Sequence, residues 1–412
     1  MDRILVATLT FGLSVLMLTG CDDGSSAPNP DGARRTQAPG SPRPGFITGA
    51  WTRLPDSGLS PRDAPAAAHV PTDDGDLVVF VGGDTGPPCP PNASCILHED
   101  SKASDGAAYD LETGTWRPIT TAPRPIAPYS STAVLDDTLY VLTDGDLLAW
   151  DATEDTWTEL DAPAKIRDAT LVADTFSGRS RLVLASPSDE IRIRPDRTYD
   201  PADDSWSRLP ANPLRPSFDR VLIPTPSGLV LTAHRIGTDG GPDDPSLVHA
   251  AVLRPGATEW EVFPANDDQL GGRYSWTGQR LVDPTVGGAD GGQVNNYGRT
   301  IPYGGALDPA TGAWSALRDA PKQFSGGWGV DAPGGPLSTV DGWVYDDGDA
   351  GRGNTWTRLP QPDDAPEMPG RGVWVDDLLI VSGGADGDGI DGTEKLAAEN
   401  VWSTGTWAYL AG

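Results

Sequence analysis

A tryptophan followed three positions later by an apolar residue recurs eight times in this chain, and no other feature restricts its fold as strongly. Successive tryptophans of this motif lie between 41 and 65 residues apart, about 51 on average. The eight pairs are Trp51/Leu54, Trp116/Ile119, Trp157/Leu160, Trp206/Leu209, Trp260/Phe263, Trp314/Leu317, Trp356/Leu359 and Trp407/Leu410. A period of this length is typical of architectures in which one small supersecondary unit is copied along the chain.

A second spacing falls inside the same repeat. Four aspartates each precede their tryptophan by six residues, namely Asp110, Asp151, Asp200 and Asp308. The residues between them favour a tight turn that joins two strands, the second of which opens with the tryptophan. Further upstream, two apolar runs end in paired glycines, Leu77–Gly83 and Leu378–Gly384. Each repeat therefore predicts several short strands joined by turns.

The composition agrees with short strands and disfavours two classes of partner. Of 412 residues, 50 are Gly and 40 are Pro, about 22% together. Because both residues interrupt regular structure, long helices are excluded. The formal net charge of −29 repels phosphate backbones and anionic headgroups, so nucleic acid is not expected as a partner and the membrane surface is a poor one.

Four apolar residues, a double glycine and a later tryptophan, at a period near 50, resemble kelch repeats from about residue 47 to the C-terminus. This resemblance implies an all-β fold, a seven-bladed kelch-type β-propeller with four-stranded blades. Two repeats depart from the pattern. Blade two has Asp144-Gly145 where the double glycine belongs, and blade six is eroded around Gly342–Gly353.

Eight tryptophan motifs for seven blades predict how the ring closes. Propellers usually let strands from both ends of the chain share one blade, which removes open sheet edges. We therefore expect Trp51–Leu54 to form the outer strand of the last blade. The segment around Trp407 would be the third strand of that blade or an added edge.

The first twenty residues read as an export signal. An apolar run from Ile4 to Leu18 has the length of a signal-peptide core and is short for a membrane span. It ends in Leu18-Thr19-Gly20-Cys21, which resembles the lipobox of bacterial lipoproteins. The resemblance implies cleavage before Cys21 and a lipid on its thiol. The alternative is a free cysteine after an uncleaved anchor.

These features divide the chain into a signal peptide (1–20), a tether rich in Pro, Gly and Ser (21–46) and the propeller (47–412). The expected location is the extracytoplasmic face of the cell membrane, where the lipid on Cys21 is the sole contact with the bilayer. In an exported protein, Cys89 and Cys95 predict a disulfide within a proline-rich loop. The alternative is a metal site with His98, for which the remaining ligands are missing.

Topology predicts which face binds a ligand. The connection from the second to the third strand and the crossover to the next blade share one face, and here those connections are long and irregular. Such loops around a central channel are where propellers usually recognise ligands. Four arginines fall in the crossovers 8 to 15 residues after a tryptophan, Arg62, Arg124, Arg215 and Arg371.

Kelch propellers include sialic-acid mutarotases, and a ring of arginines could pair with the carboxylate of a sugar acid. The alternative, which we favour, is that these four arginines anchor the crossovers. The family also includes copper-radical galactose oxidases, but the cysteines and the four histidines do not match that site, so this activity is not expected. No cofactor or metal is expected. Asp386–Asp391 offers three carboxylates for calcium, although its spacing favours a solvated acidic loop.

The sequence thus predicts a monomeric, membrane-anchored propeller that serves as a scaffold for an envelope or extracellular protein or glycan. The catalytic residues, if there are any, stay unknown. The alternative is a carbohydrate-active enzyme, similar to a sugar-acid mutarotase or epimerase, with its site at the channel mouth.

Overall fold

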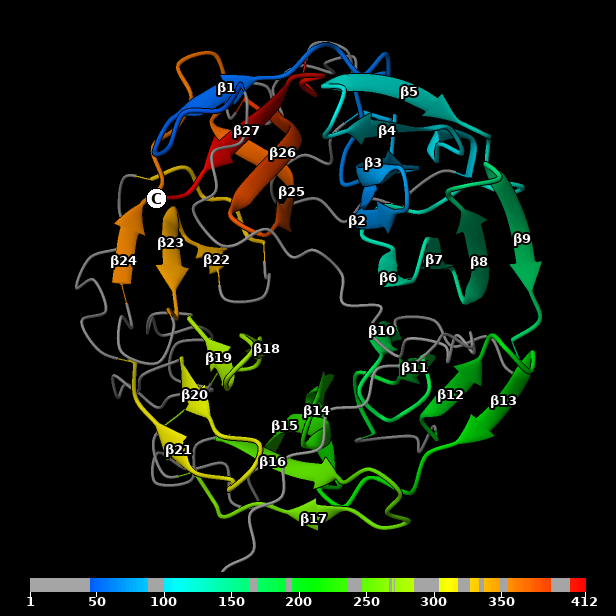
Figure 1. Cartoon of the computed structure of the whole chain (residues 1–412), viewed down its shortest axis with the longest axis vertical. Coiled ribbons are helices and arrows are strands. Elements are labelled where there is room, and N and C mark those ends of the chain that lie inside the picture. Colours follow the sequence, from blue (N-terminus) through cyan, green and yellow to red (C-terminus); the bar gives the residue numbers. More distant parts are fainter. Residues whose placement is uncertain are drawn as a thin grey trace, which may run out of the picture. The chain divides into compact units, whose positions relative to one another are not determined.

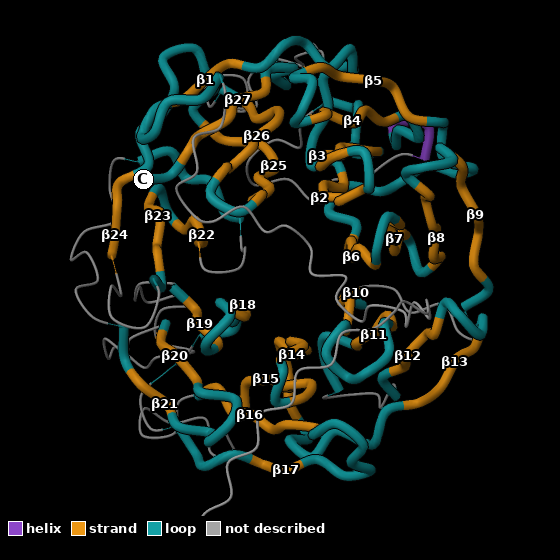
Figure 2. Tube along the Cα trace, in the orientation of Figure 1, coloured by secondary structure: helices purple, strands orange, loops and turns teal. Residues whose placement is uncertain are grey.

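Small antiparallel sheets make up the part of the chain that the computed structural model describes. That part comprises residues 45–87, 99–162, 169–189, 195–235, 247–266, 269, 271–284, 304–317, 327–332, 337–348, 355–386 and 401–412. Seven sheets follow one another around a central axis, which confirms the seven-bladed propeller (Figure 1). Figure 2 shows strands and loops almost throughout, with one short 3-10 helix, η1 (Glu99–Ser101).

Each blade runs from an inner first strand to an outer fourth strand. Blades one to three contain β2 (Ala66–Thr72), β3 (Gly75–Val81), β4 (Gly106–Asp110), β5 (Thr115–Ile119); β6 (Ser131–Leu135), β7 (Thr138–Thr143), β8 (Asp146–Asp151), β9 (Thr156–Leu160); and β10 (Thr170–Asp174), β11 (Arg181–Ala185), β12 (Arg197–Asp200), β13 (Ser205–Arg208). Blades four and five contain β14 (Ser217–Thr225), β15 (Gly228–Arg235), β16 (Val248–Leu253), β17 (Glu261–Val262); and β18 (Ser275–Trp276), β19 (Leu281–Asp283), β20 (Gly305–Leu307), β21 (Trp314–Ser315). Blades six and seven contain β22 (Leu337–Val340), β23 (Trp343–Asp346), β24 (Thr355–Arg358); and β25 (Met368–Val375), β26 (Leu378–Ala385), β27 (Thr406–Leu410), β1 (Trp51–Arg53).

The last blade is closed by the N-terminal strand, as the surplus tryptophan motif predicts. Its order is β1-β27-β26-β25, with Trp51 opposite Tyr409 and Arg53 opposite Trp407. The segment around Trp407 is therefore the third strand of the blade. Shared between both ends of the chain, this blade leaves no open edge in the ring.

Blade six has three regular strands, because its inner position is taken by residues 327–332. Ala332 pairs with Thr339 of β22 in a single antiparallel bridge. The eroded region around Gly342 is a tight turn between β22 and β23, in which Asp341 and Gly342 both have positive φ. Asp144 and Gly145 adopt the same conformations between β7 and β8, which accounts for the departure in blade two.

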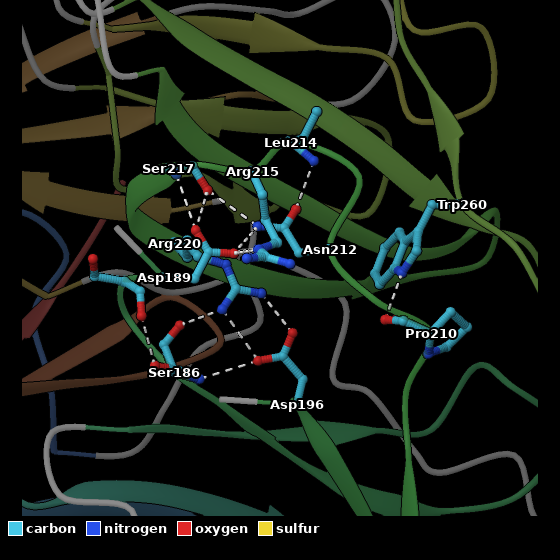
Figure 3. Close-up of polar contacts among 11 residues, drawn as sticks. Ser186, Asp189, Asp196, Pro210, Asn212, Leu214, Arg215, Ser217, Arg220 and Trp260 are labelled. Carbon is cyan, nitrogen blue, oxygen red and sulfur yellow. Dashed lines mark hydrogen bonds and ion pairs between the residues drawn. The ribbon is translucent and has the colours of Figure 1, made fainter. Parts of the chain in front are cut away.

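The tryptophan motif has a physical cause that recurs around the ring. Outer tryptophans of six blades donate the indole N–H to the backbone carbonyl four residues after the tryptophan of the preceding blade, whereas the indole N–H of Trp356 in blade six has no partner in the described residues. Six such bonds are described: Trp51 to Pro360, Trp116 to Pro55, Trp157 to Thr120, Trp206 to Asp161, Trp260 to Pro210 and Trp314 to Pro264. The Trp260 bond is drawn in Figure 3. We call these contacts the tryptophan links.

The core lies between blades, where the flat sheets pack face to face. Central strands β3, β11 and β26 are almost entirely buried and read as continuous apolar runs. Paired glycines follow β3 and lie near the end of β26, where the chain turns sharply against a neighbour. At Gly82 (φ +70°) an added Cβ would lie 2.4 Å from the Cβ of buried Ile126, in the crossover to blade two. Only glycine fits this close approach.

Candidate functional site

The four predicted arginines lie on or next to the crossovers, but the structure does not gather them into one group. Arg62 is the most buried of the four, with a side chain 5% exposed. Its guanidinium donates to both oxygens of Asp105, at 2.8 and 3.0 Å, and to the carbonyl of Gly82 at 3.2 Å. Because this fork joins both ends of the connection between β3 and β4, Arg62 has the contacts of an anchor.

Arg124 occupies the matching position in the crossover to blade two. It forms ion pairs with Asp146 at the start of β8 and with Glu159 of β9, the latter at 2.5 Å. These two carboxylates raise the pKa of Arg124 above its ordinary value. Arg124 thus pairs with two carboxylates of its own blade and has the contacts of an anchor, although about a third of its side chain is exposed.

Arg215 belongs to a polar network at the junction of blades three and four (Figure 3). Its Nε lies 3.1 Å from Oδ2 of Asp189, whose side chain is only 2% exposed. Asp189 also accepts hydrogen bonds from the backbone N–H of Ser217 and from the amide of Asn212. Arg215 thus secures the start of β14 to the connection that follows β11.

Arg220, five residues later, was not singled out by its sequence context, yet it is the most buried arginine of this network. Its side chain is 1% exposed and its Nη2 lies 2.5 Å from Oδ2 of Asp196, itself 3% exposed. Nη1 donates to the carbonyl of Ser186 at 2.8 Å. As at Arg62, one guanidinium joins the residue after a second strand to the residue before a third strand (Figure 3).

Arg371 differs from the other three. It lies on β25, an inner strand, and its buried Nε has no hydrogen-bond partner in the described part of the chain. The charged group that it influences is Asp63, which immediately precedes β2 of the neighbouring blade. Inner strands β2 and β25 lie side by side, which brings Arg371 near the residues that precede β2.

Tyr129 completes this group from the other side. Its backbone N–H donates to the carbonyl of Ala64 at 3.1 Å, and its hydroxyl lies close enough to Asp63 for that carboxylate to raise its pKa. The ring is 68% exposed, and the backbone has a φ of +59°, an uncommon conformation for a residue other than glycine. We call Asp63, Asp84, Tyr129 and Arg371 the axial cluster.

The electrostatics of the axial cluster suit proton transfer and hydrogen bonding. Burial, followed by the charge of Asp84, raises the pKa of Asp63, while the backbone N–H of Ala64 and the charge of Arg371 counteract part of that rise. Burial and the charge of Asp63 raise the pKa of Tyr129, which therefore stays a hydrogen-bond donor. The cluster thus presents a carboxyl, a phenol and a guanidinium to solvent at one end of the axis.

Sequence reasoning named one of these four residues. Asp63 follows Arg62 directly, but nothing in the repeat marks it, since Arg371 and Tyr129 come from blades seven and two. Tyr129 precedes β6 in a Pro-Tyr-Ser segment without a motif. The signal that could have indicated them is their position, because every residue just before an inner strand lies near the axis on the crossover face.

Several other predicted sites fall outside the described residues. Cys21, Cys89, Cys95 and His98 are among these, so neither the lipid attachment nor the disulfide is tested. Asp386 is described, and its Oδ1 accepts the N–H of Glu367 at 3.1 Å, whereas Asp391 is not described. Within the described ranges there is no group of three potential metal ligands. Nor does any helix there have the length and apolarity to cross a membrane.

Comparison with known proteins finds a distant similarity to a solved structure. No protein-family model matches the chain, and no curated protein does. A solved structure described as "Structure of YjhT" matches over 82% of this chain and 94% of its own, with 12% identity and a TM-score of 0.41. Nothing about a ligand or an activity follows from a similarity at this level.

Proposed function

We propose that this protein is a lipid-anchored, kelch-type propeller of a bacterial envelope that binds an extracellular glycan or protein partner on its crossover face. The observation that carries the proposal is the axial cluster. Arg371 keeps a guanidinium without an ion-pair partner in the described residues, beside an exposed tyrosine ring and the Asp63 carboxyl. The other three arginines are occupied by carboxylates within the scaffold.

A glycan suits these groups well. Carboxyl, phenol and guanidinium side chains together supply donors and acceptors for adjacent sugar hydroxyls, and the exposed face of Tyr129 offers apolar contact to a sugar ring. Two aspartates and one arginine leave the cluster with a negative balance, within a chain of net charge −29. A neutral glycan is therefore favoured over an anionic one.

The binding proposal is tested with a screen of glycans and cell-wall polymers against the soluble chain from residue 22 onward. Arg371→Ala and Tyr129→Phe are expected to weaken the interaction by about tenfold each, in the range for a hydrogen bond to a charged or phenolic group. Arg179→Ala, which removes an exposed arginine of blade three, serves as the control and should leave affinity unchanged. A ligand whose affinity is unaffected by both cluster variants would place the binding surface elsewhere.

The second candidate is a sugar-acid mutarotase or epimerase, favoured by the raised pKa of Asp63 next to Tyr129 and Arg371. A carboxyl whose pKa is raised is a better candidate for proton transfer than one that is fully ionised and solvated. Here the substrate carboxylate would pair with Arg371. Turnover of sialic acid anomers, followed by NMR, should be lost in Asp63→Asn.

The pH dependence of binding distinguishes the two candidates. Above its raised pKa, Asp63 becomes negative, so an acidic sugar paired with Arg371 should bind more weakly as pH rises through that value. A neutral glycan experiences no such repulsion, and its affinity should change little. Calorimetric titration at several pH values, with Asp63→Asn as the pH-independent reference, measures the difference.

Membrane attachment is a separate expectation. Since no second membrane signal occurs in residues 22–46, Cys21→Ala should release the protein into the medium or leave an uncleaved precursor. Cell fractionation and the mass of the mature N-terminus check the outcome. Processed, membrane-bound Cys21→Ala protein in cells would contradict the lipobox assignment.

A further inference from the structure

A cavity lies between blades two and three, away from the axial cluster. It has a volume of about 220 Å³, and its floor is the face of blade two formed by β7, β8 and β9. Thr138, Asp151 and Thr156 of this floor flank the first-to-second and third-to-fourth strand turns of the blade. Those turns lie on the face opposite the crossovers. Tyr199 and Pro201 of blade three form the facing wall.

The preceding pair of blades shows why this space is open. Between blades one and two, Arg117 extends from β5 over the ring of Trp150, 5.7 Å from its centroid, and donates to the carbonyl of Ala152. Arg117 pairs with Ala108, as Thr158 pairs with Ala149 one blade later. A short threonine therefore replaces the long side chain that fills the equivalent position, and Tyr199 stands where Trp150 does.

The wall and floor carry hydroxyl groups that are not consumed by the fold. Tyr140 is 6% exposed, lines the cavity, and its hydroxyl has no hydrogen-bond partner in the described residues. It lies close enough to Tyr199 for the two hydroxyls to interact electrostatically. The Tyr199 hydroxyl donates to Asp204 at 3.0 Å, which leaves its oxygen free to accept.

The lining decides the class of ligand. Among the described residues no cationic side chain lines the cavity, and Asp151 is present, so anions are disfavoured. A metal ion would find few free oxygens, because Oδ1 of Asp151 already accepts the N–H groups of Thr153 and Glu154. Ala149 and Leu160 add a small apolar patch among the hydroxyls. Hydroxyl groups around an apolar patch match a sugar ring, which has polar edges and apolar faces.

We propose that this interblade cavity is a binding site for one neutral sugar ring, with the Tyr140 hydroxyl as its central hydrogen-bonding group. The volume is below the roughly 300–1,000 Å³ of pockets for drug-sized ligands, which fits a single ring. The site is independent of the axial cluster. It accepts either a free monosaccharide or the terminal residue of a glycan.

The test uses NMR titration of the soluble chain with D-glucose, D-galactose, D-mannose and N-acetyl-D-glucosamine, and with the methyl glycoside and a disaccharide of the best binder. We expect saturable binding of at least one sugar. Tyr140→Phe should weaken it by about three- to tenfold. If the disaccharide binds as tightly as the monosaccharide, the natural ligand is the terminal residue of a glycan. If the disaccharide binds more weakly, the natural ligand is a free sugar.

Thr158→Arg is the decisive variant, because it copies the arginine of the preceding blade. Its guanidinium should lie over Tyr199 and reach the carbonyl of Pro201, which fills the cavity and abolishes sugar binding. Arg371→Ala should leave this binding unchanged, so the result does not depend on the proposed function. Absence of saturable binding by all four sugars, or binding that survives in Thr158→Arg, overturns the proposal. Tyr140→Phe keeps the test valid if Thr158→Arg unfolds.

Discussion

Replacement of Arg220 by methionine is expected to lower the free energy of unfolding by about 3–5 kcal/mol. The change leaves the carboxylate of Asp196 without its guanidinium partner at a position where both side chains are nearly inaccessible to water. It also removes the donor to the Ser186 carbonyl. Because Arg220 lies on an inner strand of blade four and both partners lie in blade three, the loss acts on the junction between blades. Urea unfolding followed by tryptophan fluorescence measures it.

A matched control comes from blade three, which also holds the two partners of Arg220. Arg179 pairs with Asp200 and Asp203, but its side chain is 66% exposed. Arg179→Met should therefore cost under about 1 kcal/mol. The double change Arg220→Met/Asp196→Leu should recover part of the stability, because no buried charge then stays unpaired. Equal losses in Arg220→Met and Arg179→Met would show that burial does not determine the contribution of these ion pairs.

The second large effect concerns ring closure at Trp407. This side chain is 1% exposed on β27 and packs edge-to-face on Trp328, with ring centroids 5.7 Å apart. Its indole N–H donates to Asp364 at 2.9 Å, and that bond is the main cause of the lowered pKa of Asp364. Trp407→Ala should lower the free energy of unfolding by about 3–5 kcal/mol, the range for deletion of a buried aromatic.

The effect should exceed that of Trp206→Ala, because outer-strand Trp206 is only partly buried. Trp407→Phe keeps the aromatic packing but loses the bond to Asp364, so it should fall between wild type and Trp407→Ala. Trp407→Ala is also expected to increase proteolysis near β1, which pairs only with β27. A smaller loss in Trp407→Ala than in Trp206→Ala would mean that the closing blade contributes little to stability.

The repeat made the architecture predictable because its spacing reflects a contact that recurs in six of the seven blades. The tryptophan motif contains an indole donor, which bonds a carbonyl of the preceding blade, and a nearby carbonyl, which accepts from the tryptophan of the next blade. The surplus motif at Trp51 indicated the shared last blade for the same reason. Residues 327–332 carry no such motif, and the inner position of blade six was accordingly not anticipated.

The candidate sites were less predictable, because they depend on residues that meet only once. Tyr129 and Asp63 become neighbours through the backbone bond from Tyr129 to Ala64, and the unusual φ of Tyr129 has no sequence signal. Arg215 and Arg220 lie in one segment, yet only the structure shows which of them is buried. The interblade cavity likewise has Thr158 at the position where the preceding blade has Arg117, a difference that appears only when strands are aligned by register.

The tryptophan links also define the segment by which such a chain can change length in evolution. Every link runs from a tryptophan to a carbonyl just after the preceding tryptophan, in one rotational sense. Duplication of a segment from one tryptophan to the next therefore supplies one new donor with one new acceptor, wherever it is inserted. A segment cut at the blade boundaries would supply one donor and one acceptor for six of the seven blades. The seventh blade is the exception, because its outer strand β1 precedes the first complete blade in the chain. The segment that can be duplicated, from one tryptophan to the next, is thus shifted by one strand relative to the blade.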